Sequence, residues 1–542
     1  MAKKKILFFL QDGVGGAERV SVLFGKSLDR QQYDVKFCLI ERNSKTSIAD
    51  FIPEDYPIVH IPKASPLKMI WNLFNIVRRE HPHVVFSSVM YLNTKILPWN
   101  FLFPNIRFVI RCENYLYTFN KKQQQRMAFT YKKADAIIAQ TQEMKDELVS
   151  EMHIDEHKIT VIQNPVDTKL IDRLVAEGNN PYPQDGRKHI VASGRFHYQK
   201  GYDLLINAFA KVCDKRKDID LYIIGNTNYG GGQYYEEIMA LTKELKIENR
   251  VHCVGFQKNP YVYVRYADCF VLSSRWEGLP NVMIEAQYLG TPVAAFKCIP
   301  VIERLLTDGA DGYLAEKEDT NSLADAIQKA LFLERQQKVY QSDAITEFEK
   351  IILGKSKITN KRQLKYWCRL DFESYQMTHP LAAKFTYGEH WEMFSYMRNL
   401  RYLEYYTNKS KRYPLDRLLK GWHWLRHRRN CKRKDIFIAP NTFGSGCHLQ
   451  HRGFRHILPG TKIGANCEVL PMVLIGKKRP NLKEWQITIG DNCYISTGVT
   501  ILGPITIGDN VTIAAGAVVT KDVPDGAIVA GVPAKIIKQK NC

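Results

Sequence analysis

The chain has 542 residues, of which 45% are hydrophobic and 25% are charged, and its formal net charge is +21. This length exceeds what one hydrophobic core usually organises, so two to four domains are expected. No apolar run reaches the roughly 18 residues of a membrane span, which argues against an integral membrane protein. The 12 cysteines are scattered without metal-ligand spacing, which predicts reduced thiols, no bound metal and a cytoplasmic protein.

The first 345 residues alternate short aliphatic runs with amphipathic stretches. Runs such as KILFFL and VKFCLI are typical of buried parallel strands, and we expect the first of them to be a strand rather than a signal peptide. The pattern restarts after Gln163-Asn164-Pro165 with HIVASG and DLYIIG. Two α/β domains, residues 1–170 and 171–345, are therefore predicted, with ligands at the carboxyl ends of the strands.

Two turns in these domains suit an anionic ligand. Gly15 and Gly16 follow the first predicted strand and precede a helix, so that backbone can approach a ligand there, although a plain tight turn fits equally well. Arg195 and Lys200 flank the turn after HIVAS. Two cations at this place can hold a diphosphate, but an ordinary surface loop would show the same pattern.

Two carboxylates bracket the start of a later predicted helix. Glu277 precedes a Gly-Leu-Pro turn, and Glu285 lies eight residues further on, inside the helix. A helix N-terminus can meet a phosphate, and carboxylates accept hydrogen bonds from sugar hydroxyls. The structural alternative is a capping glutamate followed by a solvent-facing one.

The segments GGAER, GRFHYQKG, SSRWEGLPNVMIEA, GTPVAAF and DGYL, in this order, resemble family 4 of the retaining glycosyltransferases, which have the GT-B fold of two Rossmann-like domains. The resemblance covers roughly residues 4–340. It implies a nucleoside-diphosphate sugar donor (UDP- or GDP-linked), no metal, and an acceptor held mainly by the N-terminal domain. By this resemblance Arg195 and Lys200 bind the diphosphate. Glu277 is the catalytic carboxylate at the donor sugar, and Glu285 binds the ribose.

The same resemblance implies that Gly15 and Gly16 approach the donor phosphates across the cleft. One departure is the segment Arg111-Cys112-Glu113-Asn114, which stands where many family members have a histidine. Which N-terminal residue meets the donor sugar is therefore left open. The apolar stretch at 65–77 is either a core helix or a helix that contacts a lipid-linked acceptor at the membrane.

Residues 346–434 lose the α/β alternation and read as a linker followed by aromatic-rich helices. The expected role of the aromatic side chains is packing against the next domain. The last part of this region, together with the residue that follows it, is strongly basic: residues 401–435 contain 12 Lys or Arg and three acidic residues. We interpret this excess as attraction to an anionic membrane surface, with a solvated basic face as the alternative, and no nucleic-acid signature accompanies it.

The last hundred residues have a strict six-residue period. An aliphatic residue recurs at each of these positions: Ile457, Ile463, Val469, Ile475, then, after an excursion, Ile489, Ile495, Ile501, Ile507, Ile513 and Val519. Such a period predicts a parallel β-helix, here left-handed and covering residues 435–542. The fold class is therefore α/β plus β.

Three histidines, His448, His451 and His456, lie close together just before this frame, and the residues alone do not choose a general base among them. The segment from PNTFGSGCHLQHRGF to the ending GVPAK resembles the serine acetyltransferase-like hexapeptide acyltransferases. The resemblance implies a homotrimer that binds acetyl-CoA between coils, with His451 as the catalytic base. Asp435 is out of register with the aspartate that orients this histidine in serine acetyltransferases.

Basic residues at the coil, Lys477, Lys478 and Lys535, are the candidates for the CoA phosphates. Together the two resemblances predict a bifunctional enzyme of surface polysaccharide synthesis, which transfers a sugar and O-acetylates a hydroxyl. Two alternatives stay open. The coil is an inactive trimerisation scaffold for the glycosyltransferase, or it is a fused L-serine O-acetyltransferase.

Overall fold

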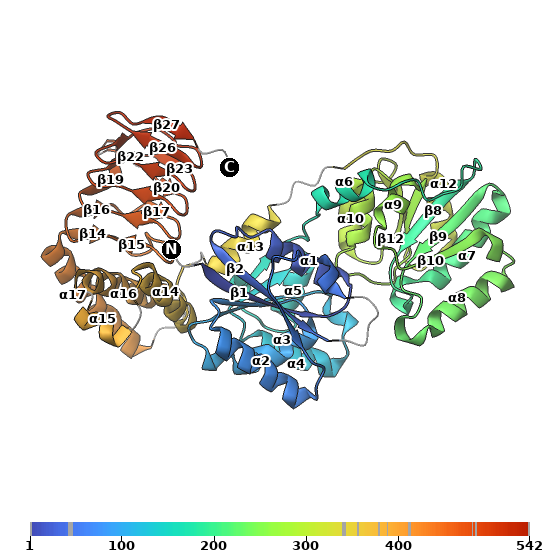
Figure 1. Cartoon of the computed structure of the whole chain (residues 1–542), viewed down its shortest axis with the longest axis horizontal. Coiled ribbons are helices and arrows are strands. Elements are labelled where there is room, and N and C mark those ends of the chain that lie inside the picture. The colour runs from blue at the N-terminus through green and yellow to red at the C-terminus, as the bar shows by residue number, and fades with distance from the viewer. Residues whose placement is uncertain are drawn as a thin grey trace.

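The computed structural model describes residues 3–41, 47–338, 343–354, 357–377, 380–386, 388–409, 413–479, 481–482 and 485–539. Its parts lie in a row (Figure 1), with the β-coil and its helices at one end, a first α/β domain in the middle and a second α/β domain at the other end. The predicted fold class is confirmed: two parallel α/β sheets are followed by helices and a parallel β-coil.

The first sheet has the strand order β3-β2-β1-β4-β5-β6-β7, and every pairing is parallel. Its strands are β1 (Lys4–Gln11), β2 (Tyr33–Ile40), β3 (Ile58–Ile61), β4 (Val84–Ser87), β5 (Arg107–Arg111), β6 (Ala136–Ala139) and β7 (Ile159–Val161). The sheet is flanked by α1 (Gly16–Lys26), α2 (Pro66–Glu80), α3 (Met90–Ile96), α4 (Lys121–Tyr131) and α5 (Gln142–Ser150). The central strand β1 is buried along its aliphatic run because helices cover both faces.

The second sheet has the order β10-β9-β8-β11-β12-β13. Its strands are β8 (Lys188–Ser193), β9 (Ile219–Ile224), β10 (Val251–Gly255), β11 (Cys269–Leu272), β12 (Val293–Phe296) and β13 (Gly312–Ala315). Its helices are α6 (Thr168–Ala176), α7 (Tyr202–Lys215), α8 (Gln233–Glu244), α9 (Tyr261–Tyr266), α10 (Asn281–Tyr288), α11 (Pro300–Leu305) and α12 (Thr320–Ala330). In both sheets the strand order reverses beside the first strand, which places a ligand crevice at that edge.

The coil stacks three parallel sheets. They comprise β14 (Ile436–Ile438), β16 (Arg455–Ile457), β19 (Val473–Lys477), β22 (Thr500–Gly503) and β25 (Val518–Val519); β15 (His448–Leu449), β18 (Glu468–Val469), β21 (Tyr494–Ile495), β24 (Thr512–Ile513), β26 (Ala527–Ala530) and the antiparallel β27 (Lys535–Gln539); and β17 (Thr461–Ile463), β20 (Ile487–Ile489) and β23 (Ile505–Ile507). The predicted aliphatic positions stack in register, as in Ile457↔Ile475↔Ile501 and Ile463↔Ile489↔Ile507. The excursion leaves the coil between β19 and β20.

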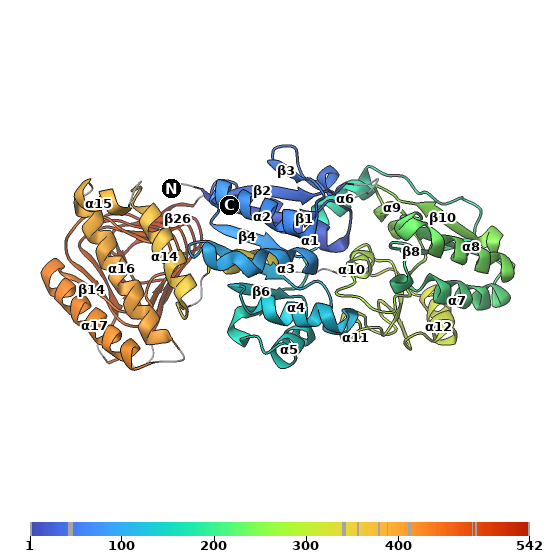
Figure 2. The ribbon, with the colours of Figure 1, turned by 90° about the horizontal axis from the view of Figure 1, so that it is seen from below.

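A layer of helices covers the N-terminal end of the coil (Figure 2). It consists of α14 (Lys361–Ser374), α15 (Pro380–Thr386), α16 (Gly388–Asn408) and α17 (Pro414–Lys434). Tyr375, Phe394 and Tyr396 pack in one cluster with the coil aliphatics, as the sequence predicted for this aromatic-rich segment. No helix in the described ranges is long and apolar enough to cross a membrane.

A buried ion cluster joins the helical layer to the first turn of the coil. Arg401 donates to Asp371 Oδ2 over 2.7 Å and to Glu404 Oε2 over 3.1 Å, and all three side chains are buried. The same guanidinium donates to the carbonyl of Phe443 over 2.8 Å, and Asp371 accepts from the Gly446 amide over 2.8 Å. These bonds fix the turn that leads into β15.

The first α/β domain is attached to the helical layer and to α13 (Ala344–Leu353). Phe348 of α13 stacks on Phe24 with ring centroids 4.3 Å apart. Arg362 of α14 holds Asp135 over 2.8 Å, and His83 lies 2.6 Å from Glu373. The division of the chain at 170, 345 and 434 stays a proposal, and the second of these points falls inside α13.

Two candidate active sites

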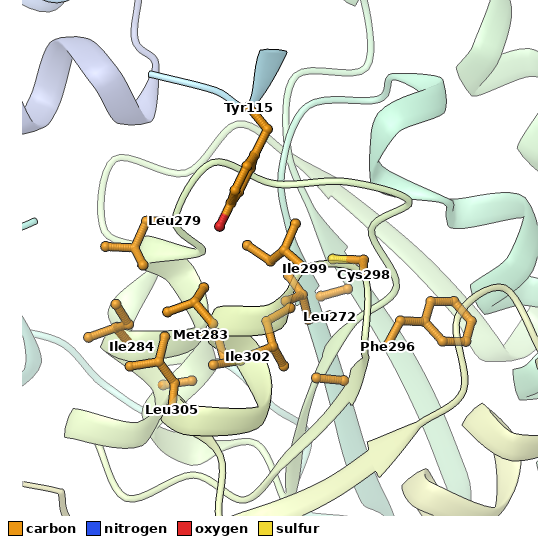
Figure 3. Packing of buried hydrophobic residues seen from close by; sticks show 14 of the residues in the cluster. Tyr115, Leu272, Leu279, Met283, Ile284, Phe296, Cys298, Ile299, Ile302 and Leu305 are labelled. Carbon is orange, nitrogen blue, oxygen red and sulfur yellow. The ribbon is translucent and has the colours of Figure 1, made fainter. Parts of the chain in front are cut away.

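The first candidate site lies where the two α/β domains meet. Gly278, in the turn before α10, approaches the N-terminal domain so closely that a Cβ there would lie 2.0 Å from the carbonyl oxygen of Glu113. A second contact between the domains is the hydrogen bond from the Asn164 side-chain amide to Asn281 Oδ1, over 2.7 Å. Tyr115 points from the N-terminal domain toward Leu279 and Ile299 of the second domain (Figure 3).

The predicted catalytic glutamate is held by two donors at this junction. Lys200 Nζ lies 2.6 Å from Glu277 Oε1, and Ser274 Oγ donates to the same oxygen over 2.6 Å. Lys200 reaches this position because Gly201 turns the chain with a φ of +61°, against the Ser273 carbonyl. The fold thus brings two of the predicted residues into one ion pair, in which Glu277 is buried and Lys200 is partly buried.

The glycine turn lies opposite α10. A Cβ on Gly16 would lie 3.4 Å from the side-chain nitrogen of Asn281, and one on Gly15 would lie 2.4 Å from the carboxylate of Glu18. Gly15 is also the N-cap of α1. The turn therefore faces the second domain with backbone and a helix N-terminus, which suits an anion between the domains.

Glu285 lies in the second turn of α10, behind this contact. Burial raises its pKa to about 7, which Arg19 of α1 and the Tyr261 hydroxyl oppose. The Tyr261 hydroxyl lies 3.5 Å from Glu285 Oε1. Glu285 is therefore a carboxyl of the second domain whose electrostatic partner, Arg19, comes from the N-terminal domain.

Glu113, in the segment that departs from the family pattern, lies just beyond the carboxyl end of β5. Its Oε1 accepts from the Met90 amide over 3.3 Å, and the Gln140 side chain donates to its carbonyl over 2.8 Å. Burial and, next, the neighbouring Glu18 raise its pKa to about 7, against Arg111 and Arg195. Its only sequence signal was the departure from histidine in that segment.

The raised pKa values of Glu113 and Glu285 predict a pH dependence of stability. Each carboxyl keeps its proton to about pH 7 in the folded chain, while the unfolded chain releases it near 4.5. The free energy of unfolding should therefore fall as the pH rises from 4.5 to about 7, by on the order of 1 kcal/mol for each group.

We expect Glu285→Gln to remove part of this fall. Apparent melting temperatures at acidic and neutral pH measure it, with Glu236→Gln on the exposed face of α8 as the control. Equal pH slopes for the wild type and Glu285→Gln would contradict the prediction.

The second candidate site is the loop between β15 and β16. His451 adopts a φ of +55° and its side chain is 63% exposed. Its Nδ1 lies 3.4 Å from Glu389 Oε2 of α16, and Glu389 Oε1 accepts from the Arg452 amide. That amide, with a smaller contribution from His451, holds the pKa of Glu389 below its usual value against the effect of burial.

The other two histidines have different surroundings. His448 packs edge-on against Tyr375, 4.2 Å between centroids, and its Nδ1 lies 3.2 Å from Glu468 Oε1. His456 stands on β16 in register with Phe437 and Leu474. Among the three, His451 therefore combines solvent access with a carboxylate on Nδ1, the arrangement of an oriented general base.

A buried arginine that sequence reasoning missed shapes this loop. Arg455 is completely buried, and its guanidinium donates to the carbonyls of Gln450, His451 and Gly453. Burial lowers its pKa to about 10. Asp435, by contrast, ends α17 in the left-handed conformation, and its carbonyl accepts from the Arg455 amide over 2.8 Å. The carboxylate beside His451 thus comes from the helical layer.

The predicted CoA lysines lie on different coils. Lys477 ends β19, where its Nζ donates to the Leu482 carbonyl over 3.1 Å and stands 5.4 Å from the ring of Trp485. Lys478 is exposed beside it, and Lys535 begins β27 at the far end of the coil. Within the described ranges, no three His, Cys, Asp or Glu side chains converge as metal ligands, and every cysteine there is a free thiol.

Comparison with known families matches the parts of the chain separately. The model "Glycosyltransferase Family 4" matches residues 14–170, "Glycosyl transferases group 1" matches 179–346, and "Bacterial transferase hexapeptide (six repeats)" matches 486–521. The chain is therefore a group 1/family 4 glycosyltransferase of the GT-B type with a hexapeptide transferase repeat at its C-terminal end.

Curated relatives resemble the glycosyltransferase part. An uncharacterized glycosyltransferase of Methanocaldococcus jannaschii is 30% identical over 43% of this chain and 60% of its own length. An N-acetylgalactosaminyltransferase of Campylobacter jejuni that acts on a diphospho-undecaprenol glycan is 28% identical over 42% of this chain and 60% of its own length. The amylovoran biosynthesis glycosyltransferase AmsD of Erwinia amylovora is 24% identical over 62% of this chain and 93% of its own length. The chain thus spans about 60% of the length of the first and second of these relatives.

Among solved structures, Anabaena HepE in complex with UDP-glucose aligns with a TM-score of 0.54 at 18% identity, over 65% of this chain and 94% of HepE. Sucrose-phosphate synthase of Thermosynechococcus elongatus aligns with a TM-score of 0.50 at 18% identity, over 61% and 90%. These likenesses show the fold alone.

Proposed function

We propose that the GT-B part transfers a sugar, with retention of configuration, from a UDP- or GDP-linked donor to a lipid-linked glycan of surface polysaccharide synthesis. The Lys200–Glu277 ion pair at the junction of the two domains is the observation that carries this proposal. The named activities of the Campylobacter and Erwinia relatives support the acceptor class, and the UDP-glucose complex of HepE supports the donor class.

In this transfer the bond between the sugar C1 and the diphosphate oxygen breaks, and a bond from C1 to the acceptor oxygen forms. The proton of the acceptor hydroxyl passes to the departing diphosphate. Lys200 and Arg195 offset the charge that develops on the departing diphosphate. Glu277 orients Lys200 and meets the sugar, Glu285 binds the ribose, and the Gly15–Gly16 backbone approaches the phosphates. Glu113 is placed to meet the sugar from the acceptor side.

The coil, in this proposal, transfers an acetyl group from acetyl-CoA to a hydroxyl, preferably on the same glycan. With Nδ1–H directed at Glu389, the free Nε2 of His451 takes the proton of the acceptor hydroxyl. The oxygen then attacks the thioester carbonyl, the C–S bond breaks, and CoA leaves as the thiol with a proton returned from the imidazolium. Lys477, Lys478 and Lys535 are the candidates to hold the CoA phosphates in a homotrimer that binds acetyl-CoA between coils.

Both donors are cytoplasmic metabolites, so the proposed place of action is the cytoplasmic membrane face. One chain that carries both activities raises the local concentration of the shared glycan.

The test is acetyl transfer by the full-length protein, with a lipid-linked glycan fraction and L-serine offered separately and products identified by mass. His451→Ala should lower transfer on the order of 100- to 10,000-fold. Glu389→Gln should give a smaller loss and shift the pH profile, because it removes the charge beside the imidazole. His456→Ala, the matched histidine on the outer face of β16, should leave the rate unchanged.

Each acceptor gives a distinct answer. A His451-dependent acetyl group on the glycan supports the proposal, whereas acetylation of L-serine alone makes the coil a fused serine O-acetyltransferase. Transfer to neither acceptor, with no acetyl-CoA binding in calorimetry, leaves the coil as a trimerisation scaffold.

A further inference from the structure

Helix α17 buries one face and exposes the opposite one. Its inner face carries His423, whose Nδ1 lies 2.9 Å from Asn399 of α16, and His427, whose Nε2 lies 3.0 Å from the Ile438 carbonyl of the coil. Cys431, one turn further, is also buried. The helix is therefore fixed to α16 and to β14, and its outer face has a defined orientation.

The outer face is an apolar stripe that continues as a basic one. It consists of Leu415, Leu418, Trp422, Leu425, Arg429 and Lys432. Because these residues follow one another at intervals of three or four, they lie on one side of the helix. We call this set the α17 stripe. Leu418 is 71%, Leu425 62% and Trp422 53% exposed. Four large apolar side chains in line on an exposed helix mark an interaction surface rather than a solvated face.

Cations flank the stripe and form shallow hollows with it. Leu425, Arg428, Arg429, Lys432 and Arg433 line an open hollow of about 580 Å³. A second one of about 450 Å³ lies toward the start of the helix, where Arg417, Lys420 and Trp424 contribute to the lining. Among the described residues, no carboxylate forms an ion pair with any of the four cations of the first hollow.

We propose that the α17 stripe lies in the headgroup region of an anionic lipid membrane. Leu415, Leu418, Trp422 and Leu425 enter the acyl boundary, and the flanking cations bind lipid phosphates. This rests on and deepens the proposed function, because it holds the enzyme at the bilayer that carries its lipid-linked acceptor.

A second copy of the chain fits the stripe less well than lipid does. In a parallel pair, Arg429 and Lys432 of the two copies would face each other. In an antiparallel pair, these cations would be desolvated against leucines without a counter-charge. Both arrangements are unfavourable because they bring like charges together or bury unpaired ones. Lipid phosphates would instead pair with these cations.

The position of α17 in the molecule is compatible with membrane binding by the α17 stripe. The helical layer and the helices α2–α4 of the acceptor domain lie on the same side of the molecule (Figures 1 and 2). The outer side of α2 exposes Leu67 to 81% and Trp71 to 60%, while Met69, Leu73 and Val77 are buried. This helix, for which the sequence left both a core role and a membrane contact open, thus has a buried face and an exposed apolar one.

Vesicle co-sedimentation of the full-length protein tests the proposal, with phosphatidylcholine vesicles compared with vesicles that also contain phosphatidylglycerol. We expect binding to the anionic vesicles that weakens with salt. Leu418→Ser with Leu425→Ser should weaken it on the order of tenfold or more. Arg429→Glu with Lys432→Glu should weaken it more than about tenfold, since each lost cation accounts for about fivefold.

Two matched controls separate this surface from net charge and hydrophobicity. Lys243→Glu with Lys258→Glu makes the same charge change on the donor domain, and Phe332→Ser removes an exposed aromatic there; both should bind as wild type. Absence of wild-type binding, or equal binding by all variants, overturns the proposal. A change of oligomeric state in the stripe variants, without a change in vesicle binding, assigns the stripe to a second copy.

Sugar transfer to a soluble acceptor analogue by the stripe variants should match the wild type. This assay keeps a failure of membrane docking distinct from a failure of the proposed function.

Discussion

Replacing Glu277 by glutamine should lower the rate of sugar transfer on the order of 100- to 1000-fold while acetyl transfer stays at the wild-type rate. The side chain keeps its shape and its bond to Ser274. It loses the charge that orients and neutralises Lys200, 2.6 Å away. Release of the nucleoside diphosphate with a lipid-linked acceptor measures the effect, and the glycan mass confirms the product.

The reciprocal variant is the control for this prediction. His451→Ala should keep full sugar transfer, because the coil loop and the junction of the α/β domains belong to separate parts of the chain. Lys200→Met should resemble Glu277→Gln, since either change breaks the same pair. Normal sugar transfer by Glu277→Gln would remove this residue from the proposed mechanism.

The second large effect concerns stability. Arg401→Met leaves the carboxylates of Asp371 and Glu404 buried without their cation, and it removes the donor to the Phe443 carbonyl. Loss of one partner from such a cluster costs about 3–5 kcal/mol. Faster hydrogen exchange in the first turn of the coil and a lower urea midpoint should both report it.

Arg398→Met is the matched control on the same helix. The Arg398 guanidinium lies over the Trp391 ring, 5.4 Å from its centroid, and the side chain is only partly buried. Its loss should change stability by less than about 1 kcal/mol. Equal destabilisation by the two variants would mean that the charge cluster has no special role.

The periodic parts of this chain could be predicted from its sequence because a strict period leaves few alternatives. Alternating strands and helices predicted both α/β sheets. The six-residue period predicted the parallel β-helix and its recurring aliphatic positions, among them Ile463, Ile489 and Ile507, which the structure stacks on one another. These patterns are local, and each repeat confirms the one before it.

The parts that sequence reasoning missed depend on contacts between distant segments. Glu389 reaches His451 from α16, and Asp371 and Arg401 meet through two different helices. No sequence motif or periodic pattern links the two residues of either contact. Glu113 was left unassigned for the same reason, because its surroundings are completed by Gly278 from the other domain.

The first α/β domain is fastened to the coil and its helical layer by contacts that run from one end of β1 to α14. Lys4 Nζ donates to Asn466 of the coil over 2.8 Å, and Arg369 donates to the Pro82 carbonyl over 2.9 Å. The second α/β domain lies on the side of the first domain that faces away from the coil (Figure 1). We therefore expect movements of the second domain to leave the distance between the first domain and His451 unchanged, whether or not a nucleotide sugar is bound.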